Sequence, residues 1–188
     1  GRIAGFEALI RWQRPGYGLV PPQQFISVLE DTGLIIRVGR AVIAAACKQI
    51  GLWLRSDIGP VRVSVNVSGR QFIEGDLEGD TLAAIEDNCI AGELLELELT
   101  ESSLMANTER TMASLTNLRR CGVQISIDDF GTGYSSLAYL RRFPIDTLKI
   151  DIAFIRDLTR NADASAIVLA IICMAHSLKI AVVAEGVE

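Results

Sequence analysis

Residues 123–129 read VQISIDD, and this stretch shows the pattern that indicates the fold class. A short β-rich run ends in two adjacent aspartates, and longer helix-like patterns flank it. Alternation of this kind predicts βα units, with a parallel sheet and helices outside it. The predicted strands are 3–10, 61–67, 94–100, 123–129, 147–151 and 180–185, and the predicted helices are 22–31, 38–55, 81–88, 108–121, 135–143 and 164–177.

The spacing of the strand ends limits the possible architectures. Asn66, Glu98 and Asp128 follow one another at about 30 residues, the length expected of a βαβ step. A closed eight-stranded barrel usually needs about 250 residues, whereas this chain has 188. The residues alone therefore leave two α/β architectures open: an open sheet, or a (β/α)₈ barrel with pieces missing. No linker divides the chain, so we expect one domain over residues 1–188.

Composition removes several classes of function. The formal net charge is −5, which does not attract DNA or RNA. The single histidine, His176, excludes chemistry that needs two histidines. Four cysteines without a CxxC pattern are typical of reduced thiols. We find no signal peptide and no apolar run of about 20 residues, so we expect a cytoplasmic domain whose parent protein could still be membrane-anchored.

Polar residues collect at or near the carboxyl ends of the predicted strands, where a parallel barrel carries its active site. One such carboxylate is usually a helix cap or a solvated loop residue. Capping explains the whole set poorly, because Ser and Thr would serve as well and Glu98 lies inside an apolar strand. Carboxylate and amide oxygens are ligands that suit Mg²⁺, Mn²⁺ or Ca²⁺, and such a cluster can hold two ions. The residues are Glu7, Asn66, Glu98, Glu101, Asp128, Asp129, Lys149, Asp151, Glu185 and Glu188.

The motifs of two other protein classes are incomplete in this sequence. The DFG of residues 129–131 has no HRD or VAIK motif before it, which argues against a protein kinase. The glycine pair of residues 131 and 133 lacks the third glycine of the dinucleotide fingerprint. Two basic residues remain near the predicted site. Lys149 could orient a water or stabilise negative charge on a phosphate, and Arg11 is either a phosphate ligand or a surface arginine.

The chain resembles the EAL-domain cyclic di-GMP phosphodiesterases. The resemblance begins at EALIRW (7–12) and runs in order through the whole chain. Its further motifs are PPQQFISVLEDTGLI (21–35), VSVNVSGRQF (63–72), LELELTES (95–102), ISIDDFGTGYSSLAYL (125–140), TLKIDIAFI (147–155) and AVVAEGVE (181–188).

The resemblance implies a modified TIM-like (β/α)₈ barrel that hydrolyses cyclic di-GMP to linear pGpG with Mg²⁺ or Mn²⁺, with two ions expected. It also implies a homodimer and a parent protein with sensory or cyclase domains. The resemblance also implies a role for each motif residue. A first ion would be bound by Glu7, Asn66, Glu98 and Asp128, and a second ion by Asp128, Asp129 and Glu185.

The other implied roles concern the water, the substrate and a loop. Lys149 would hold the attacking water. The substrate would be contacted by Leu9 and Arg11, with Asp151 and Glu188 in supporting roles. Glu101 would anchor the loop that begins at Asp128.

Two departures lie at the ends of the chain, where the family has a strand before EAL and further motifs after EGVE. We therefore expect a barrel that is incomplete at both ends. Two other functions remain to be separated from the enzyme. One is an EAL-like module that binds cyclic di-GMP or a protein without turnover, although the metal-ligand motifs are intact. The other is a different metal-dependent barrel, such as an enolase-like lyase, against which the DDFGTG loop argues.

Overall fold

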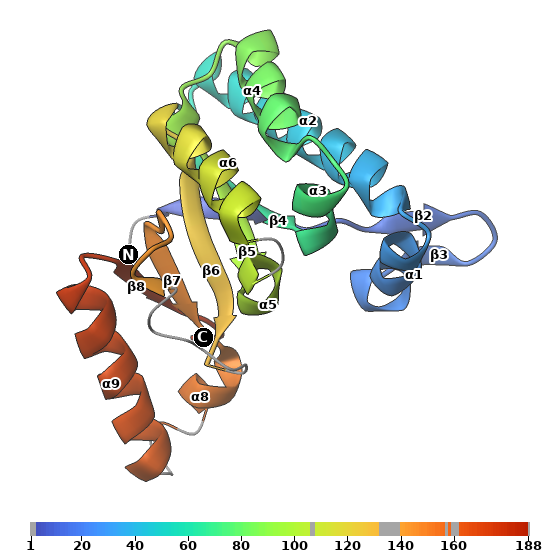
Figure 1. Ribbon diagram of the computed structural model, residues 1–188. Helices are drawn as coiled ribbons and strands as arrows, with labels where there is room; N and C mark the ends of the chain where they lie inside the picture. The colour runs from blue at the N-terminus through green and yellow to red at the C-terminus, as the bar shows by residue number, and fades with distance from the viewer. Residues whose placement is uncertain (1–2, 106–107, 132–139, 157, 159–161, 188) are drawn as a thin grey trace.

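Six parallel strands form the centre of the molecule, in the spatial order β1-β4-β5-β6-β7-β8 (Figure 1). The structure is a computed structural model that describes residues 3–105, 108–131, 140–156, 158 and 162–187. The strands are β1 (Gly5–Ala8), β4 (Arg62–Val67), β5 (Leu95–Thr100), β6 (Gln124–Phe130), β7 (Thr147–Ile150) and β8 (Ala181–Ala184). All six predicted strands are confirmed, and no strand end differs from its predicted position by more than two residues. Because every neighbouring pair is parallel, the six carboxyl ends meet at one edge.

Helices cover the outer face of this sheet. Figure 1 shows α2, α4 and α6 packed side by side over β4, β5 and β6, with α9 beside β8. The helices are α1 (Ile26–Asp31), α2 (Leu34–Leu54), α3 (Gly69–Ile73), α4 (Leu77–Asn88), α5 (Glu101–Met105), α6 (Thr108–Arg120), α8 (Ile152–Arg156) and α9 (Ala162–Ser177), with short 3₁₀ turns at Pro22–Gln24 and Gly92–Leu94.

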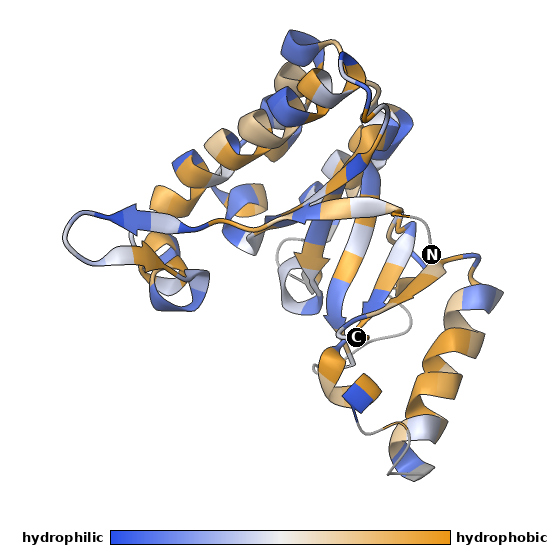
Figure 2. Ribbon diagram, turned by 180° about the vertical axis from the view of Figure 1, so that it is seen from behind, coloured by the Kyte–Doolittle hydropathy of each residue, from blue (hydrophilic) through white to orange (hydrophobic). Residues whose placement is uncertain are grey.

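Strand β5 shows how the sheet separates its two faces. Leu95, Leu97 and Leu99 are fully buried and belong to the apolar core shared with the covering helices. Successive side chains of a strand point to opposite faces. Glu96 and Glu98 therefore point to the other, concave face, where both are buried. The strands curl around this concave face as a half-barrel, with β1 and β8 at the two edges of the sheet (Figures 1 and 2).

Some elements escaped the sequence prediction. A hairpin of β2 (Trp12–Arg14) and β3 (Gly18–Val20) projects from the body of the molecule (Figure 2). Its strands have three residues each, too few to show an alternating pattern. The five-residue helices α3, α5 and α8 were not expected either, because one helical turn leaves little periodicity. Most of the helix predicted at 135–143 lies outside the described residues.

Helix α9 is apolar around most of its circumference (Figure 2). Its Ala175 is fully buried, whereas Ile167 and Leu169, which lie on opposite flanks of the helix, are exposed. None of the helices in the described ranges combines the length and apolar character needed to cross a membrane.

Candidate active site

Lys149 is the centre of a charged cluster at the carboxyl edge of the sheet. Its Nζ lies 3.1 Å from Glu98 Oε1, 3.2 Å from Asp128 Oδ1 and 2.8 Å from Glu185 Oε1. These carboxylates come from three different strand ends, those of β5, β6 and β8. Burial lowers the pKa of Lys149, but the three carboxylates outweigh burial and raise it above its ordinary value. The ammonium group is therefore charged, and it joins parts of the chain that are far apart in sequence.

Glu98 is the most deeply buried carboxylate of the cluster, with 2% of its side chain exposed. Burial raises the pKa of Glu98 to about 7, although Lys149 and the Ser64 hydroxyl favour its ionised form. One of its oxygens contacts Lys149, and the other, Oε2, has no hydrogen-bond partner among the described residues. The negative charge of Glu98 is therefore buried beside one ammonium, and a second cation at the cluster would stabilise it further.

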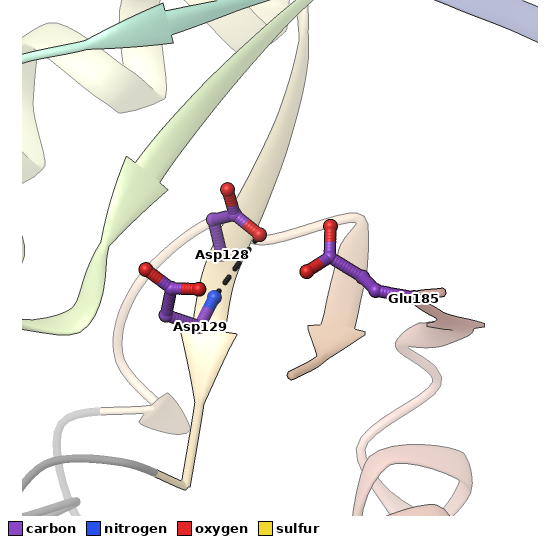
Figure 3. A group of neighbouring side chains, drawn as sticks. All are labelled: Asp128, Asp129 and Glu185. Carbon is purple, nitrogen blue, oxygen red and sulfur yellow. Dashed lines mark hydrogen bonds between the residues drawn. The ribbon is translucent and has the colours of Figure 1, made fainter. Parts of the chain in front are cut away.

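Asp128 and Asp129 are adjacent residues whose carboxylates approach the same point (Figure 3). On a regular strand they would point to opposite faces. Here Asp129 adopts a left-handed backbone conformation, with φ of 53°, where the pairing of β6 with β7 shifts register between Ile127 and Phe130. Aspartate tolerates this conformation better than most residues. The irregularity thus brings two carboxylates to one site.

Asp128, Asp129 and Glu185 form a trio in which one carboxylate oxygen from each residue lies within 4.8 Å of the other two. Burial raises the pKa of Asp129 to about 6, with Asp128, Asp151 and Glu185 adding to the rise. Burial also raises the pKa of Glu185, against the opposing effect of Lys149. These three residues are the predicted ligands of the second metal ion, and the structure brings them together.

Glu7 and Asn66 form a separate pair on β1 and β4. Asn66 Nδ2 donates to Glu7 Oε1 over 2.8 Å. Asn66 is also the register partner of Glu98, so the pair continues the row of polar residues across the sheet. An amide that donates through nitrogen keeps its carbonyl oxygen as an acceptor. In the predicted first metal site these residues join Glu98 and Asp128, but here the Lys149 ammonium bridges those two carboxylates.

The remaining predicted site residues lie outside the three ion pairs of Lys149, and each has its own surroundings. The Asp151 carboxylate accepts a 2.6 Å hydrogen bond from Ala153 N at the start of α8, and Asp151 also acts on Asp129. Leu9 is exposed and lines a cleft beside β4. Arg11 is exposed, and its guanidinium donates to the Ile10 carbonyl over 2.8 Å. Glu101 begins α5, and the loop it would anchor falls mostly outside the described residues, as does Glu188.

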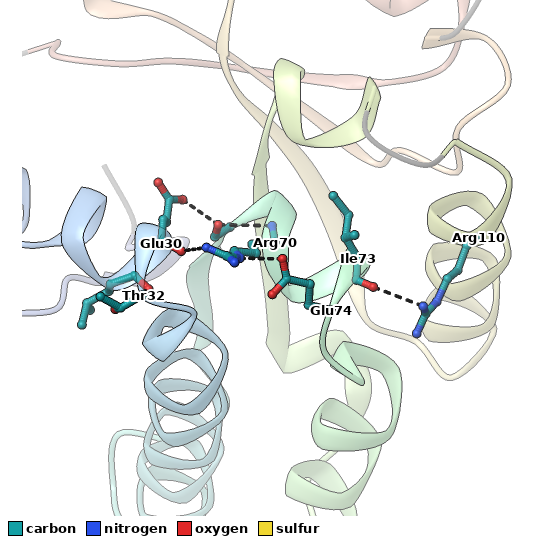
Figure 4. Close-up of polar contacts among 8 residues, drawn as sticks. Glu30, Thr32, Arg70, Ile73, Glu74 and Arg110 are labelled. Atoms are coloured by element: carbon teal, nitrogen blue, oxygen red, sulfur yellow. Dashed lines mark hydrogen bonds and ion pairs between the residues drawn. The ribbon is translucent and has the colours of Figure 1, made fainter.

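The cleft next to Asn66 was not predicted. It has a volume of about 340 Å³ and is lined mainly by apolar residues, including Leu9. A polar network holds its wall (Figure 4): Ser68 Oγ donates to Glu30 Oε1 over 2.6 Å, and Arg70 contacts both the Glu30 carbonyl and Glu74. Ser68 caps α3, and in the sequence a serine there signals only a cap. The network ties α1 to the end of β4, which carries Asn66.

A hard divalent cation fits the donor set of this site. Glu98, Asp128 and Glu185 gather around the ammonium of Lys149, and Asp129 lies beside Asp128 and Glu185. Burial raises the pKa of Asp129 most, and the neighbouring carboxylates Asp128, Asp151 and Glu185 raise it further. Carboxylate oxygens are ligands of magnesium, manganese and calcium rather than of softer metals. The fold and site therefore define a class: barrel-type α/β proteins with an acidic, metal-compatible site at the carboxyl ends of the strands.

Comparison with known proteins gives the family. The EAL domain family model matches residues 1–188, and the chain belongs to that family. It is 43% identical over 188 residues to the bifunctional diguanylate cyclase/cyclic di-GMP phosphodiesterase MucR of Pseudomonas aeruginosa, covering all of this chain and 27% of MucR. It is 40% identical to the cyclic di-GMP phosphodiesterase PdeR of Escherichia coli, covering all of this chain and 28% of PdeR. The chain thus spans about a quarter of these relatives.

Solved structures agree with this assignment. The chain superposes on the MucR phosphodiesterase in its c-di-GMP complex with a TM-score of 0.93 and 43% identity, covering all of this chain and 76% of that one. The predicted TIM-like α/β class is therefore confirmed, as is the family.

Proposed function

We propose that this domain hydrolyses cyclic di-GMP to linear pGpG, using Mg²⁺ or Mn²⁺. The single observation that carries the proposal is the gathering of Glu98, Asp128 and Glu185 around Lys149, with Asp129 beside them. The relatives MucR and PdeR, named for this activity, support the choice of substrate. We further propose a cytoplasmic homodimer within a longer signalling protein.

Each residue has a proposed role. Glu7, Asn66, Glu98 and Asp128 would hold one ion, and Asp128, Asp129 and Glu185 another. The bound metal supplies Lewis-acid stabilisation and lowers the pKa of water, which removes the need for a histidine base. Lys149 orients the attacking water through its ammonium N–H groups. Arg11 binds a phosphate oxygen by its guanidinium fork, and Leu9 packs against the substrate. Asp151 and Glu188 support the site, and Glu101 anchors the loop after β6.

The test is hydrolysis of cyclic di-GMP in Mn²⁺, with pGpG followed by chromatography. We expect turnover by the protein and a loss of at least about 100-fold in Asp128→Asn, which removes a charge from the cluster. Asp87→Asn removes an exposed charge from α4 and serves as the control with unchanged activity. Binding of cyclic di-GMP without any turnover would overturn the proposal and identify a non-catalytic sensor instead.

A further inference from the structure

Two fully buried oxygen atoms lie at the floor of the carboxylate cluster without hydrogen-bond partners among the described residues. They are Glu98 Oε2 and Ser126 Oγ. Glu98 and Ser126 are register partners on the adjacent parallel strands β5 and β6. Directly paired residues project from the same face of a sheet. Both oxygens therefore belong to the concave face, one step from Lys149 and Asp128.

Leaving such atoms without a partner is costly. A buried hydroxyl or carboxylate oxygen that lacks a hydrogen bond loses about 1–3 kcal/mol or more relative to water. A carboxylate oxygen only accepts, whereas a serine hydroxyl both donates and accepts. The two atoms are chemically complementary, yet they make no hydrogen bond to each other. One water molecule between them would satisfy both, because it can donate to the carboxylate while it accepts from the hydroxyl. The Ser64 hydroxyl hydrogen-bonds to the Glu98 carboxylate and is thus close enough to be a third polar neighbour of such a water.

We propose that Ser126 is a positioning residue for Glu98 and acts through one water bound between Ser126 Oγ and Glu98 Oε2. The water holds the deep oxygen of Glu98, so that Oε1 stays directed toward Lys149 and the carboxylate cluster. Ser126 itself touches neither substrate nor the proposed metal. The inference rests on the proposed metal-dependent function, since its effect is read out in the binding of a divalent ion.

The test compares two buried hydroxyls of the same kind. Thr81 on α4 also has a fully buried Oγ1 with no hydrogen-bond partner in the described part of the chain, but it lies away from the cluster. If Ser126 acts on Glu98, then Ser126→Ala weakens Mn²⁺ binding by about 10–100-fold, as outer contacts of metal ligands do. Thr81→Val leaves Mn²⁺ affinity unchanged. Affinity is measured by calorimetry, with the melting temperature of each variant as a check on folding. Ser126→Thr, which keeps the hydroxyl, restores most of the affinity.

A crystal structure of the protein supplies a second readout. We expect ordered density between Ser126 Oγ and Glu98 Oε2 that is lost in Ser126→Ala. Equal Mn²⁺ affinity of the protein and Ser126→Ala, or a Ser126 hydroxyl bonded only to backbone, overturns the inference while the proposed function stands. Failure of the unaltered protein to bind Mn²⁺ overturns the proposed function itself, so the two failures are distinguishable.

Discussion

The two sides of the acidic face hold their charge differently. On the β5–β8 side, Glu98, Asp128 and Glu185 are at least partly buried and share the ammonium of Lys149. On the β1–β4 side, Glu7 is exposed and its hydrogen-bond partner Asn66 is neutral. The first side depends on a cation for its stability, whereas water solvates the charge of the second. A glutamate at position 98 therefore lowers the stability of the fold unless a cation lies beside it, whereas a glutamate at position 7 has little effect on stability.

Removal of the cation should produce the largest effect. Lys149→Met leaves Glu98 buried without its countercharge, and breaking a buried ion pair from one side costs about 3–5 kcal/mol. We expect the melting temperature to fall by roughly 10 °C in EDTA. Mn²⁺ should recover part of the loss if a divalent ion can replace the ammonium. Lys149→Arg, which keeps a charge, serves as the matched comparison. A melting temperature like that of the unaltered protein would contradict the dependence on a cation.

Acid should stabilise the metal-free protein. The pKa of Glu98 is about 7 in the fold and that of Asp129 about 6, above the ordinary values near 4. Below pH 7 the folded state therefore binds protons that the unfolded chain releases, and stability rises as pH falls. Between pH 8 and pH 6 we expect the melting temperature in EDTA to rise by about 2–6 °C. Glu98→Gln, which cannot titrate, should flatten this slope. A slope of the opposite sign would contradict the assigned burial effect.

The smallest change in stability is expected on the other side of the face. Glu7→Gln keeps the oxygen that accepts from Asn66, so unfolding should change by less than about 0.5 kcal/mol. Mn²⁺ affinity should nevertheless fall by roughly 10-fold or more, because ligand charge sets the strength of such sites. Glu86→Gln on the exposed face of α4 is the control for both measurements. A large loss of stability in Glu7→Gln would remove the contrast between the two sides.

The sequence predicted which side chains lie close together at the site, but not the backbone geometry that orients them. Strand ends at Glu98, Asp128 and Glu185 followed from regular βα spacing, and a parallel sheet brings such ends together. The left-handed Asp129 could not be predicted, because the register shift of β6 depends on its pairing with β7. The role of Ser126 has no local signal, since it emerges only when β5 and β6 align. The hairpin of β2 and β3 is too short for periodicity to detect.

The position of Lys149 has a consequence for assembly. Because an internal ammonium already neutralises part of the cluster, the domain can fold before any metal arrives. In the proposed metal-bound state, the carboxylates would exchange part of their contact with the ammonium for a divalent ion, while Lys149 orients the water. The choice of ion would then depend on how well it competes with the Lys149 ammonium for these carboxylates, rather than on how well it drives the chain to fold.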